Sequence, residues 1–333
     1  LAGALAAGNT VVIKPSAYAP ASSAVLKQIC EEAFDPCLVT VVEGGRAENE
    51  ALLDECWDKI FFTGSVSVGK LVMERASKNL TPVTLELGGK SPCIVDATAN
   101  LKVAARRIAF GKWLNVGQTC VAPDYLLVDT RVHDELLGLI KEEVRRMFGE
   151  HPLDNEDCGH IVNAKHFARV RGLIDPDKVV LGGTARETSL KIEPTILDGV
   201  SPDDAVMQEE IFGPILPVLT FESLDEAEAF ITDRPTPLAL YIFSQDRAVQ
   251  QRFVRYVPFG GGCVNDTIMH LATSHMGFGG MGASGMGQYH GRESFDTFSH
   301  KKSIVNKATW VDVPFRYAPY ASWKHKFVRM FVH

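Results

Sequence analysis

Residues 59–69 read Lys-Ile-Phe-Phe-Thr-Gly-Ser-Val-Ser-Val-Gly, an apolar run that passes directly into a glycine turn. The run Lys59–Phe62 predicts a buried strand, and the residues after Ser65 predict a helix through Lys78. The same alternation occurs twice upstream, with expected strands at 10–14 and 37–42 and expected helices at 20–33 and 46–53. Strands that alternate with helices at this spacing predict a parallel sheet with right-handed crossovers.

The alternation continues downstream, so the whole chain is predicted to be α/β. The apolar runs predict further strands at 83–87, 94–95, 125–128, 195–197, 215–221 and 239–243. Helical periodicity predicts helices at 101–113, 132–148 and 224–232. A chain of 333 residues has room for about two domains, and the double glycine after Glu86 is the boundary that we favour.

Composition excludes several classes of protein. The chain has 34 Lys and Arg against 41 Asp and Glu, a net charge of −7, which argues against binding of nucleic acid. Seven cysteines without a C-x-x-C pair indicate free thiols in a reducing compartment, so we expect a cytoplasmic protein without a structural zinc site or other metal. We expect no transmembrane helix, because no apolar run reaches the required length.

The last residues differ from the rest of the chain. Residues 301–333 carry a charge of +6, whereas residues 1–300 carry −13. The cations and aromatics of this tail are Lys301, Lys302, Lys307, Trp310, Phe315, Arg316, Tyr317, Tyr320, Trp323, Lys324, Lys326, Phe327, Arg329 and Phe331. Interleaved basic and aromatic residues suit an anionic membrane surface, and packing across a dimer interface is an equal alternative.

Two residues are candidates for covalent chemistry. Cys120 closes the loop Gly117-Gln-Thr-Cys120, where backbone donors could stabilise a thiolate, although most cysteines are inert buried thiols. Glu86 ends an apolar strand beside Gly88 and Gly89. Desolvation there would raise its pKa and suit a general base, and a structural carboxylate that accepts backbone hydrogen bonds is an equal alternative.

Two further segments are candidates for binding. The turn Phe62-Thr-Gly-Ser65 precedes a helix, where free N–H groups can meet a phosphate, but it matches neither the dinucleotide fingerprint nor the P-loop. Lys14 ends its strand and could reach a ribose hydroxyl, although a solvated charge is the more common role. The acids of Gln208-Glu-Glu210 with Phe212 could hold a ribose and a flat ring, or form an exposed turn.

Five motifs in order strongly resemble the aldehyde dehydrogenase superfamily over residues 7–305. They are Gly8-Asn-Thr-Val-Val-Ile-Lys-Pro-Ser16, Phe62-Thr-Gly-Ser65, Leu85-Glu-Leu-Gly-Gly-Lys-Ser-Pro92, Gly117-Gln-Thr-Cys120 and Glu209-Glu-Ile-Phe-Gly-Pro214. The forms of Gly117–Tyr125 and Gly285–Gly291 resemble the class 3 branch, which acts on fatty and aromatic aldehydes. The resemblance implies the remainder of a Rossmann-type dinucleotide-binding domain at 1–86, a catalytic thiol domain at 87–285, and a returning segment with an oligomerisation strand and tail at 286–333.

The resemblance also implies a role for each matching residue. Cys120 would be the nucleophile, and Glu86 would activate the water that hydrolyses a thioester. Phe278 would line the substrate entrance. The residues implied to bind NAD or NADP are Lys14, Ser16, Gly64, Ser65, Gly69, Leu87, Glu210 and Phe212. The implied reaction is oxidation of medium- or long-chain aliphatic or aromatic aldehydes to carboxylic acids, in a homodimer.

Two departures from the family pattern carry their own expectations. Leu1–Ala7 reads as the end of a helix already begun, and the family's upstream segment with its oxyanion Asn is not in this sequence, so we expect a truncated chain with little activity. An inactive fragment that only binds or dimerises is therefore an alternative to the enzyme. Ala17 stands where many relatives have Glu, which predicts that NADP is tolerated. Glu86 argues against an acyl transferase, and the surroundings of Cys120 argue against a cysteine protease.

Overall fold

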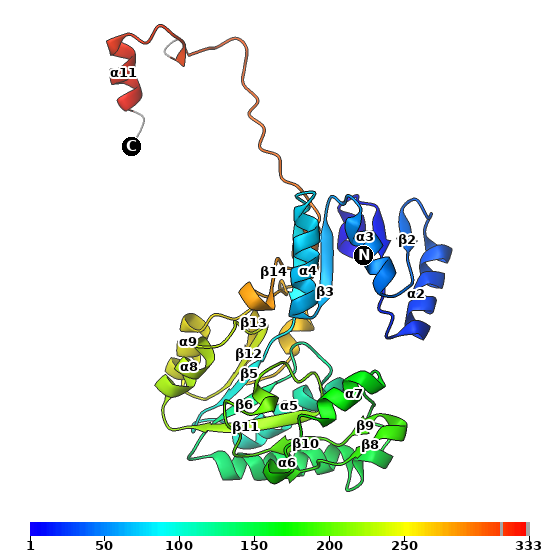
Figure 1. Cartoon of the computed structure of the whole chain (residues 1–333). Coiled ribbons are helices and arrows are strands. Elements are labelled where there is room, and N and C mark those ends of the chain that lie inside the picture. The colour runs from blue at the N-terminus through cyan, green and yellow to red at the C-terminus, as the bar shows by residue number, and fades with distance from the viewer. Residues whose placement is uncertain (314–315, 331–333) are drawn as a thin grey trace. The chain divides into compact units, whose positions relative to one another are not determined.

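The computed structural model describes residues 1–313 and 316–330, which form two compact units at Leu1–Ser299 and His300–His333 (Figure 1). The first unit contains all of the predicted strands and helices, so the α/β class is confirmed. Its helices are α1 (Ala2–Ala6), α2 (Pro20–Ala33), α3 (Arg46–Asp54), α4 (Val66–Ser77), α5 (Leu101–Trp113), α6 (His133–Phe148), α7 (Ala164–Arg171), α8 (Leu224–Thr232), α9 (Arg247–Tyr256) and α10 (Gly291–Thr297).

The first strands form two small sheets. A parallel pair joins β1 (Val11–Ile13) to β2 (Val39–Val41). A second sheet has the order β14-β4-β3, in which β3 (Ile60–Gly64) and β4 (Val83–Leu87) are parallel. Its third strand, β14 (Gly285–Met286), pairs antiparallel with β4, so the chain returns here after crossing the rest of the unit. The predicted parallel pairing is therefore confirmed. We expected the first three strands to form one sheet, but β1 and β2 form one sheet and β3 lies in another.

A seven-stranded sheet forms the centre of the first unit. Its order is β13 (Gly261–Val264), β12 (Ala239–Phe243), β5 (Pro92–Val95), β6 (Tyr125–Asp129), β11 (Ile215–Phe221), β10 (Thr195–Leu197) and β7 (Val179–Leu181). All neighbours are parallel except β7, which runs antiparallel to β10. A separate antiparallel pair joins β8 (Ala185–Arg186) to β9 (Lys191–Ile192).

Helices cover both faces of the seven-stranded sheet, and a core fills each side. Side chains alternate along a strand, so Leu126 and Val128 of β6 point into one core and Tyr125 and Leu127 into the other. The first core takes in α5 and α6, and the second takes in α7, α8 and α9. Because both faces are buried, these strands read as continuous apolar runs, which is why the sequence pattern found most of them.

Strand β13 and helix α9 carry weak sequence signals. Strand β13 is Gly-Gly-Cys-Val, and a side chain on Gly262 would place its Cβ 2.0 Å from the Leu240 carbonyl oxygen. Helix α9 buries only Val249 and Phe253, which is too few apolar residues to show a clear period. The sequence pattern did not predict β13 because tight packing there requires glycines. It did not predict α9 because the apolar stripe of that helix is narrow.

The predicted domain limits at residues 86 and 285 lie inside the first unit. The sheets do change at the first limit, because β4 ends at Leu87 and β5 begins at Pro92 in a different sheet. Residues 286–299 belong to the same compact unit as the residues before them, so the boundary between the two units falls after Ser299. The division into three domains stays a prediction.

The second unit holds the basic and aromatic tail. Its helix is α11 (Ser322–Arg329), and the side chains of Trp310 and Trp323 are strongly exposed. Phe315 and Phe331 of the predicted aromatic set lie outside the described residues. Within the part of the chain that the structure describes, no helix is both long and apolar enough to cross a membrane.

Candidate active site

The loop that carries Cys120 leaves α5 through strained backbone. Asn115, Val116 and Gly117 all have positive φ angles, of 52°, 59° and 70°. Only glycine fits at position 117, because a Cβ there would lie 2.2 Å from the Gly213 carbonyl oxygen. This close approach brings the Cys120 loop against the segment Glu209–Pro214. A left-handed turn that only glycine completes thus joins two motifs that lie far apart in the sequence.

Polar contacts fix the loop around Cys120. The Gln118 side-chain amide donates to the His160 carbonyl oxygen at 3.1 Å and accepts from the Val162 N–H at 2.9 Å. The Tyr241 hydroxyl donates to the Val121 carbonyl oxygen at 2.6 Å. These bonds hold both sides of the cysteine to other parts of the unit.

The Cys120 thiol is protonated at neutral pH in this structure. Burial first, and then the charges of Glu210 and Glu86, raise the pKa of the thiol to about 11. The backbone N–H groups of Cys120 and Val121 favour the thiolate, but they do not outweigh those three effects. The donors that the sequence suggested are therefore present, and the carboxylates work against them.

Glu86 is buried at the end of β4. Its side chain is only 2% exposed, and burial raises its pKa to about 8. The Gly280 N–H donates to the carboxyl group, whereas Oε1 has no hydrogen-bond partner among the described residues. Burial first, and then the charges of Glu86 and Cys120, raise the pKa of Tyr289, so thiol and acid share one neighbourhood. The structure thus brings together the two predicted catalytic residues.

Glu210 lies on the same double glycine that follows Glu86. A Cβ on Gly88 would fall 1.9 Å from the Oε2 atom of Glu210, so that position has no room for a side chain. The Gly89 N–H donates to the Glu210 carboxyl group, while burial and the charge of Asp124 raise its pKa to about 8. Phe212 follows with a φ of 47° and a ring that is 39% exposed. An exposed aromatic residue thus follows a partly buried acid by two positions in the chain.

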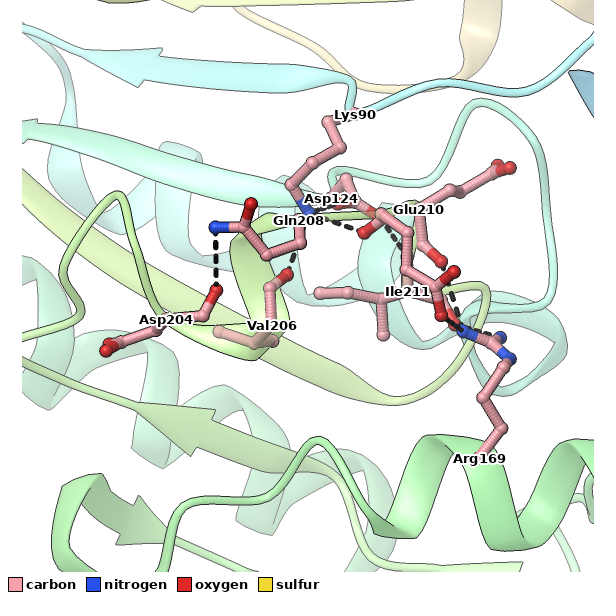
Figure 2. A network of polar contacts seen from close by, with 9 residues as sticks. Lys90, Asp124, Arg169, Asp204, Val206, Gln208, Glu210 and Ile211 are labelled. Carbon is pink, nitrogen blue, oxygen red and sulfur yellow. Dashed lines mark hydrogen bonds and ion pairs between the residues drawn. The ribbon is translucent and has the colours of Figure 1, made fainter.

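A polar network that we did not predict holds the Glu210 segment in place (Figure 2). The Lys90 ammonium pairs with Asp124 and donates to the carbonyl oxygens of Val206 at 2.9 Å and Glu209 at 3.0 Å. Asp124 accepts from the Ile211 N–H at 2.9 Å. From α7, Arg169 donates to the carbonyl oxygens of Glu210 at 3.3 Å and Ile211 at 2.6 Å, as Figure 2 shows.

A signal for this network exists in the sequence. Lys90 and Asp124 each stand one or two residues before a buried strand, where a charge needs a partner. Lys112 is fully buried on α5, and burial lowers its pKa to about 8 despite the opposing charge of Asp124. Lys112, a lysine inside an apolar helix pattern, is the clearest sign in the sequence that buried charges need partners near Asp124.

The predicted cofactor residues lie at the ends of the first strands. Ser65 caps α4, where its hydroxyl accepts from the Val68 N–H at 3.4 Å. Lys14 follows β1 and donates to the Pro15 carbonyl oxygen at 2.6 Å, and the Ser16 hydroxyl accepts from the Tyr18 N–H at 3.2 Å. Gly64 ends β3. These contacts are local, and a role in cofactor binding stays a prediction.

Gly69 has a structural explanation of its own. A Cβ on this glycine would lie 2.5 Å from the Leu87 side chain, so Gly69 allows α4 to pack on β4. Leu87 is correspondingly buried. Packing between α4 and β4 therefore explains this glycine, and a role of Gly69 and Leu87 in cofactor binding stays a prediction.

Phe278 lies in a cluster of aromatic rings. It pairs with Tyr289 through two backbone hydrogen bonds of 2.7 and 2.9 Å, and their rings meet edge to face at 5.6 Å. The rings of His290 and His270 lie 5.5 and 5.8 Å from Phe278. Phe278 is only 5% exposed. The predicted substrate residue Phe278 therefore lies in a buried cluster of aromatic rings. Its neighbour Tyr289 lies within electrostatic reach of Glu86 and Cys120.

Comparison with known proteins identifies close relatives. A model of the aldehyde dehydrogenase family matches residues 1–304. The 4,4'-diaponeurosporen-aldehyde dehydrogenase of Staphylococcus aureus is 51% identical over 333 residues, which cover 99% of this chain and 72% of that protein. Aldehyde dehydrogenase family 3 member H1 of Arabidopsis thaliana is 48% identical over 335 residues, which cover 99% of this chain and 69% of that protein.

A solved structure agrees with these relatives. The substrate-bound state of Staphylococcus aureus AldH superposes with a TM-score of 0.96 at 51% identity, over 99% of this chain and 72% of that one. The described fold therefore matches an enzyme fold of known architecture.

Proposed function

Because this chain belongs to the aldehyde dehydrogenase family, whose members oxidise aldehydes with NAD or NADP, we propose that Cys120 and Glu86 convert aliphatic or aromatic aldehydes to carboxylic acids. The observation that carries the proposal is the meeting of Cys120, Glu86 and Glu210 at one place. Each of the two acids raises the pKa of the thiol, so all three lie within electrostatic reach.

Cys120 supplies the nucleophile. Its sulfur forms a bond to the aldehyde carbon, and the carbonyl electron pair moves to oxygen, which gives a thiohemiacetal. The Cys120 and Val121 N–H groups lie at the sulfur, where they favour negative charge. Because the pKa of the free thiol is raised, attack requires that its proton is removed first, and the Glu86 carboxylate within electrostatic reach accepts it and passes it to solvent.

Polar groups at the start of α4 and in the Glu210 segment fit a nicotinamide dinucleotide. The Ser65 hydroxyl and the free N–H groups of the first turn of α4 suit a pyrophosphate, the Glu210 carboxyl suits ribose hydroxyls, and the exposed Phe212 ring suits a flat ring. Lys14, Ser16 and Gly64 would complete the binding residues. When bound, the cofactor accepts the hydride that leaves the thiohemiacetal carbon, so that a thioester remains on Cys120.

Glu86 then promotes hydrolysis of the thioester. Its Oε1 atom has no partner among the described residues and can accept a hydrogen bond from a water molecule. The Glu86 carboxylate takes a proton from that water as the water oxygen bonds to the acyl carbon. The carbon–sulfur bond then breaks, and Glu86 returns the proton to the leaving sulfur, so that the acid and the thiol are released. Because the pKa of Glu86 is about 8, this step is expected to accelerate as pH rises toward that value.

The decisive experiment replaces the thiol. Cys120→Ala should reduce the oxidation of hexanal and benzaldehyde at least a thousandfold with either cofactor, measured by absorbance of the reduced nicotinamide. Replacing the exposed Cys37 by Ala is the matched control and should change the rate little. Retained oxidation in Cys120→Ala would contradict the mechanism.

The second variant separates oxidation from hydrolysis. Glu86→Gln should release one equivalent of reduced cofactor and then stall as a thioester on Cys120, which intact-protein mass spectrometry detects. Steady turnover by this variant at the wild-type rate would show that Glu86 is not the hydrolytic base.

We further propose a cytoplasmic protein whose tail contacts an anionic membrane surface. On α11 and just before it, Tyr320, Trp323 and Phe327 follow one another at helical spacing and are exposed, while Lys326 and Arg329 supply positive charge. Vesicles of phosphatidylserine and phosphatidylcholine should co-sediment the intact chain and not a chain that lacks residues 306–333. Equal pelleting contradicts the membrane contact, and loss of a homodimer on deletion would instead assign the tail to a subunit interface.

A further inference from the structure

An open pocket lies on the surface where α5 packs against α6. Its volume is about 550 Å³, which is within the range of roughly 300–1,000 Å³ that is usual for sites that bind small organic molecules. The residues that line this α5–α6 pocket are Lys102, Val103, Arg106, Arg107 and Phe110 of α5 and Glu143 of α6. None of them belongs to the site around Cys120, so the pocket is a different site.

Two cations at the α5–α6 pocket have no anionic partner. Lys102 and Arg106 are exposed, and neither forms an ion pair or a hydrogen bond with another side chain among the described residues. By contrast, Arg107 donates to the Asn265 carbonyl oxygen and lies 3.9 Å from the carboxylate of Asp266. Arg107 is therefore held in place, whereas the charges of Lys102 and Arg106 are free to meet an anion.

The apolar residues of the pocket distinguish it from an ordinary charged surface. Val103 and Phe110 are 38% and 43% exposed, and both line the pocket together with Arg106. The helical rise of about 1.5 Å per residue places Phe110 about 6 Å beyond Arg106 along the axis of α5. A ligand that lies along α5 can therefore contact the cations with one end and an aromatic ring with the other.

Glu143 limits the charge of the ligand. Its carboxylate lines the α6 side of the pocket and pairs with Arg146. A ligand with several negative charges, such as a polyphosphate, would bring some of them against this carboxylate, whereas a single negative charge fits at Lys102 and Arg106. The pocket therefore favours a monoanion with an apolar body.

We propose that the α5–α6 pocket binds a carboxylate with an apolar tail, such as a medium-chain fatty acid. The carboxylate accepts hydrogen bonds from Lys102 and Arg106, and the tail lies on Val103 and Phe110. An exposed ion pair alone contributes little to binding, so the charged head and the apolar tail act together. Acids of this class are also products of the proposed oxidation, but the inference does not depend on that activity.

Photolabelling locates the ligand. The full chain is irradiated with an octanoate analogue that carries a diazirine group in its tail, and mass spectrometry identifies the labelled residues. We expect labels on residues 102–110 or on Glu143, and an excess of octanoate should suppress them. Labels that occur only in other parts of the chain, or labels that octanoate does not suppress, overturn the proposal.

Calorimetric titration with octanoate tests the role of the two cations. Replacing Lys102 and Arg106 together by Gln should weaken binding about tenfold, because the charge-assisted hydrogen bonds to the carboxylate are lost. Replacing the exposed Arg145 and Lys165 together by Gln removes the same charges elsewhere and should leave the affinity unchanged. All four side chains are exposed, so both variants should fold, which circular dichroism checks. An unchanged affinity in the first variant overturns the proposal.

The same titration tests the role of the tail. Phe110→Ser removes the aromatic contact and should weaken the binding of octanoate about fivefold. Acetate, which has the charge without the tail, and 1-octanol, which has the tail without the charge, should both bind much more weakly than octanoate. Equal affinities for octanoate and 1-octanol, or for octanoate and acetate, overturn the proposal. These measurements need no turnover, so a failure of the proposed oxidation is recognised separately.

Discussion

Replacing Glu86 by Gln should stabilise the fold, and the gain should grow with pH. Burial raises the pKa of Glu86 from an ordinary value of 4.5 to about 8 in the folded protein. Between those two values the folded chain holds a proton that the unfolded chain has released. Stability therefore falls as pH rises, because the native state binds more protons than the unfolded state. The glutamine side chain of the variant keeps the shape of the original and does not titrate.

The magnitude follows from the shift. One pKa unit corresponds to about 1.4 kcal/mol. Ionisation of Glu86 in the unfolded chain therefore lowers the free energy of unfolding by about 2 kcal/mol at pH 6 and by about 4 kcal/mol at pH 8. The difference in unfolding free energy between Glu86→Gln and the unmodified chain should therefore increase by about 2 kcal/mol over this interval. Above pH 8 the difference should level off, since both states are then ionised.

Urea unfolding at a series of pH values measures this difference directly. Glu142→Gln, which changes an exposed acid on α6, is the matched control and should give a difference that is nearly independent of pH. A pH-independent difference for Glu86→Gln, or one that shrinks between pH 6 and pH 8, would refute the claim that burial keeps Glu86 protonated.

Three further outcomes are expected. Gly88→Ala should displace the Glu210 carboxyl group, because the new Cβ would lie 1.9 Å from Oε2. The KM of the nucleotide should rise about tenfold in initial-rate assays. An unchanged KM would contradict the role of Glu210. Lys90→Met should lower the unfolding free energy by about 3 kcal/mol in urea titrations, because Asp124 loses its buried partner; a neutral result would show that Lys112 replaces it. Ala17→Glu should raise the KM of NADP more than that of NAD; an equal effect on both would contradict the interpretation of position 17.

The sequence predicted individual residues better than their surroundings. Cys120 and Glu86 are candidates because each belongs to a short motif, and glycines mark the sharp turn beside each one. The raised pKa of Glu86 was also expected, since an apolar strand end implies desolvation. The raised pKa of the Cys120 thiol was not, because it depends on burial and then on two acids that lie 34 residues before and 90 residues after it in the chain.

The sequence by itself determined the α/β alternation, because strand and helix periods and glycine turns are local properties. The roles of Cys120, Glu86 and Glu210 came from ordered motifs that resemble a family, and they stay predictions. Only the tertiary structure decided which strands share a sheet, and that β14 returns to pair with β4. It alone showed that Lys90, Asp124 and Arg169 hold the Glu210 segment. Those contacts join residues that are far apart in the chain, so their energies arise only when packing excludes water from between them.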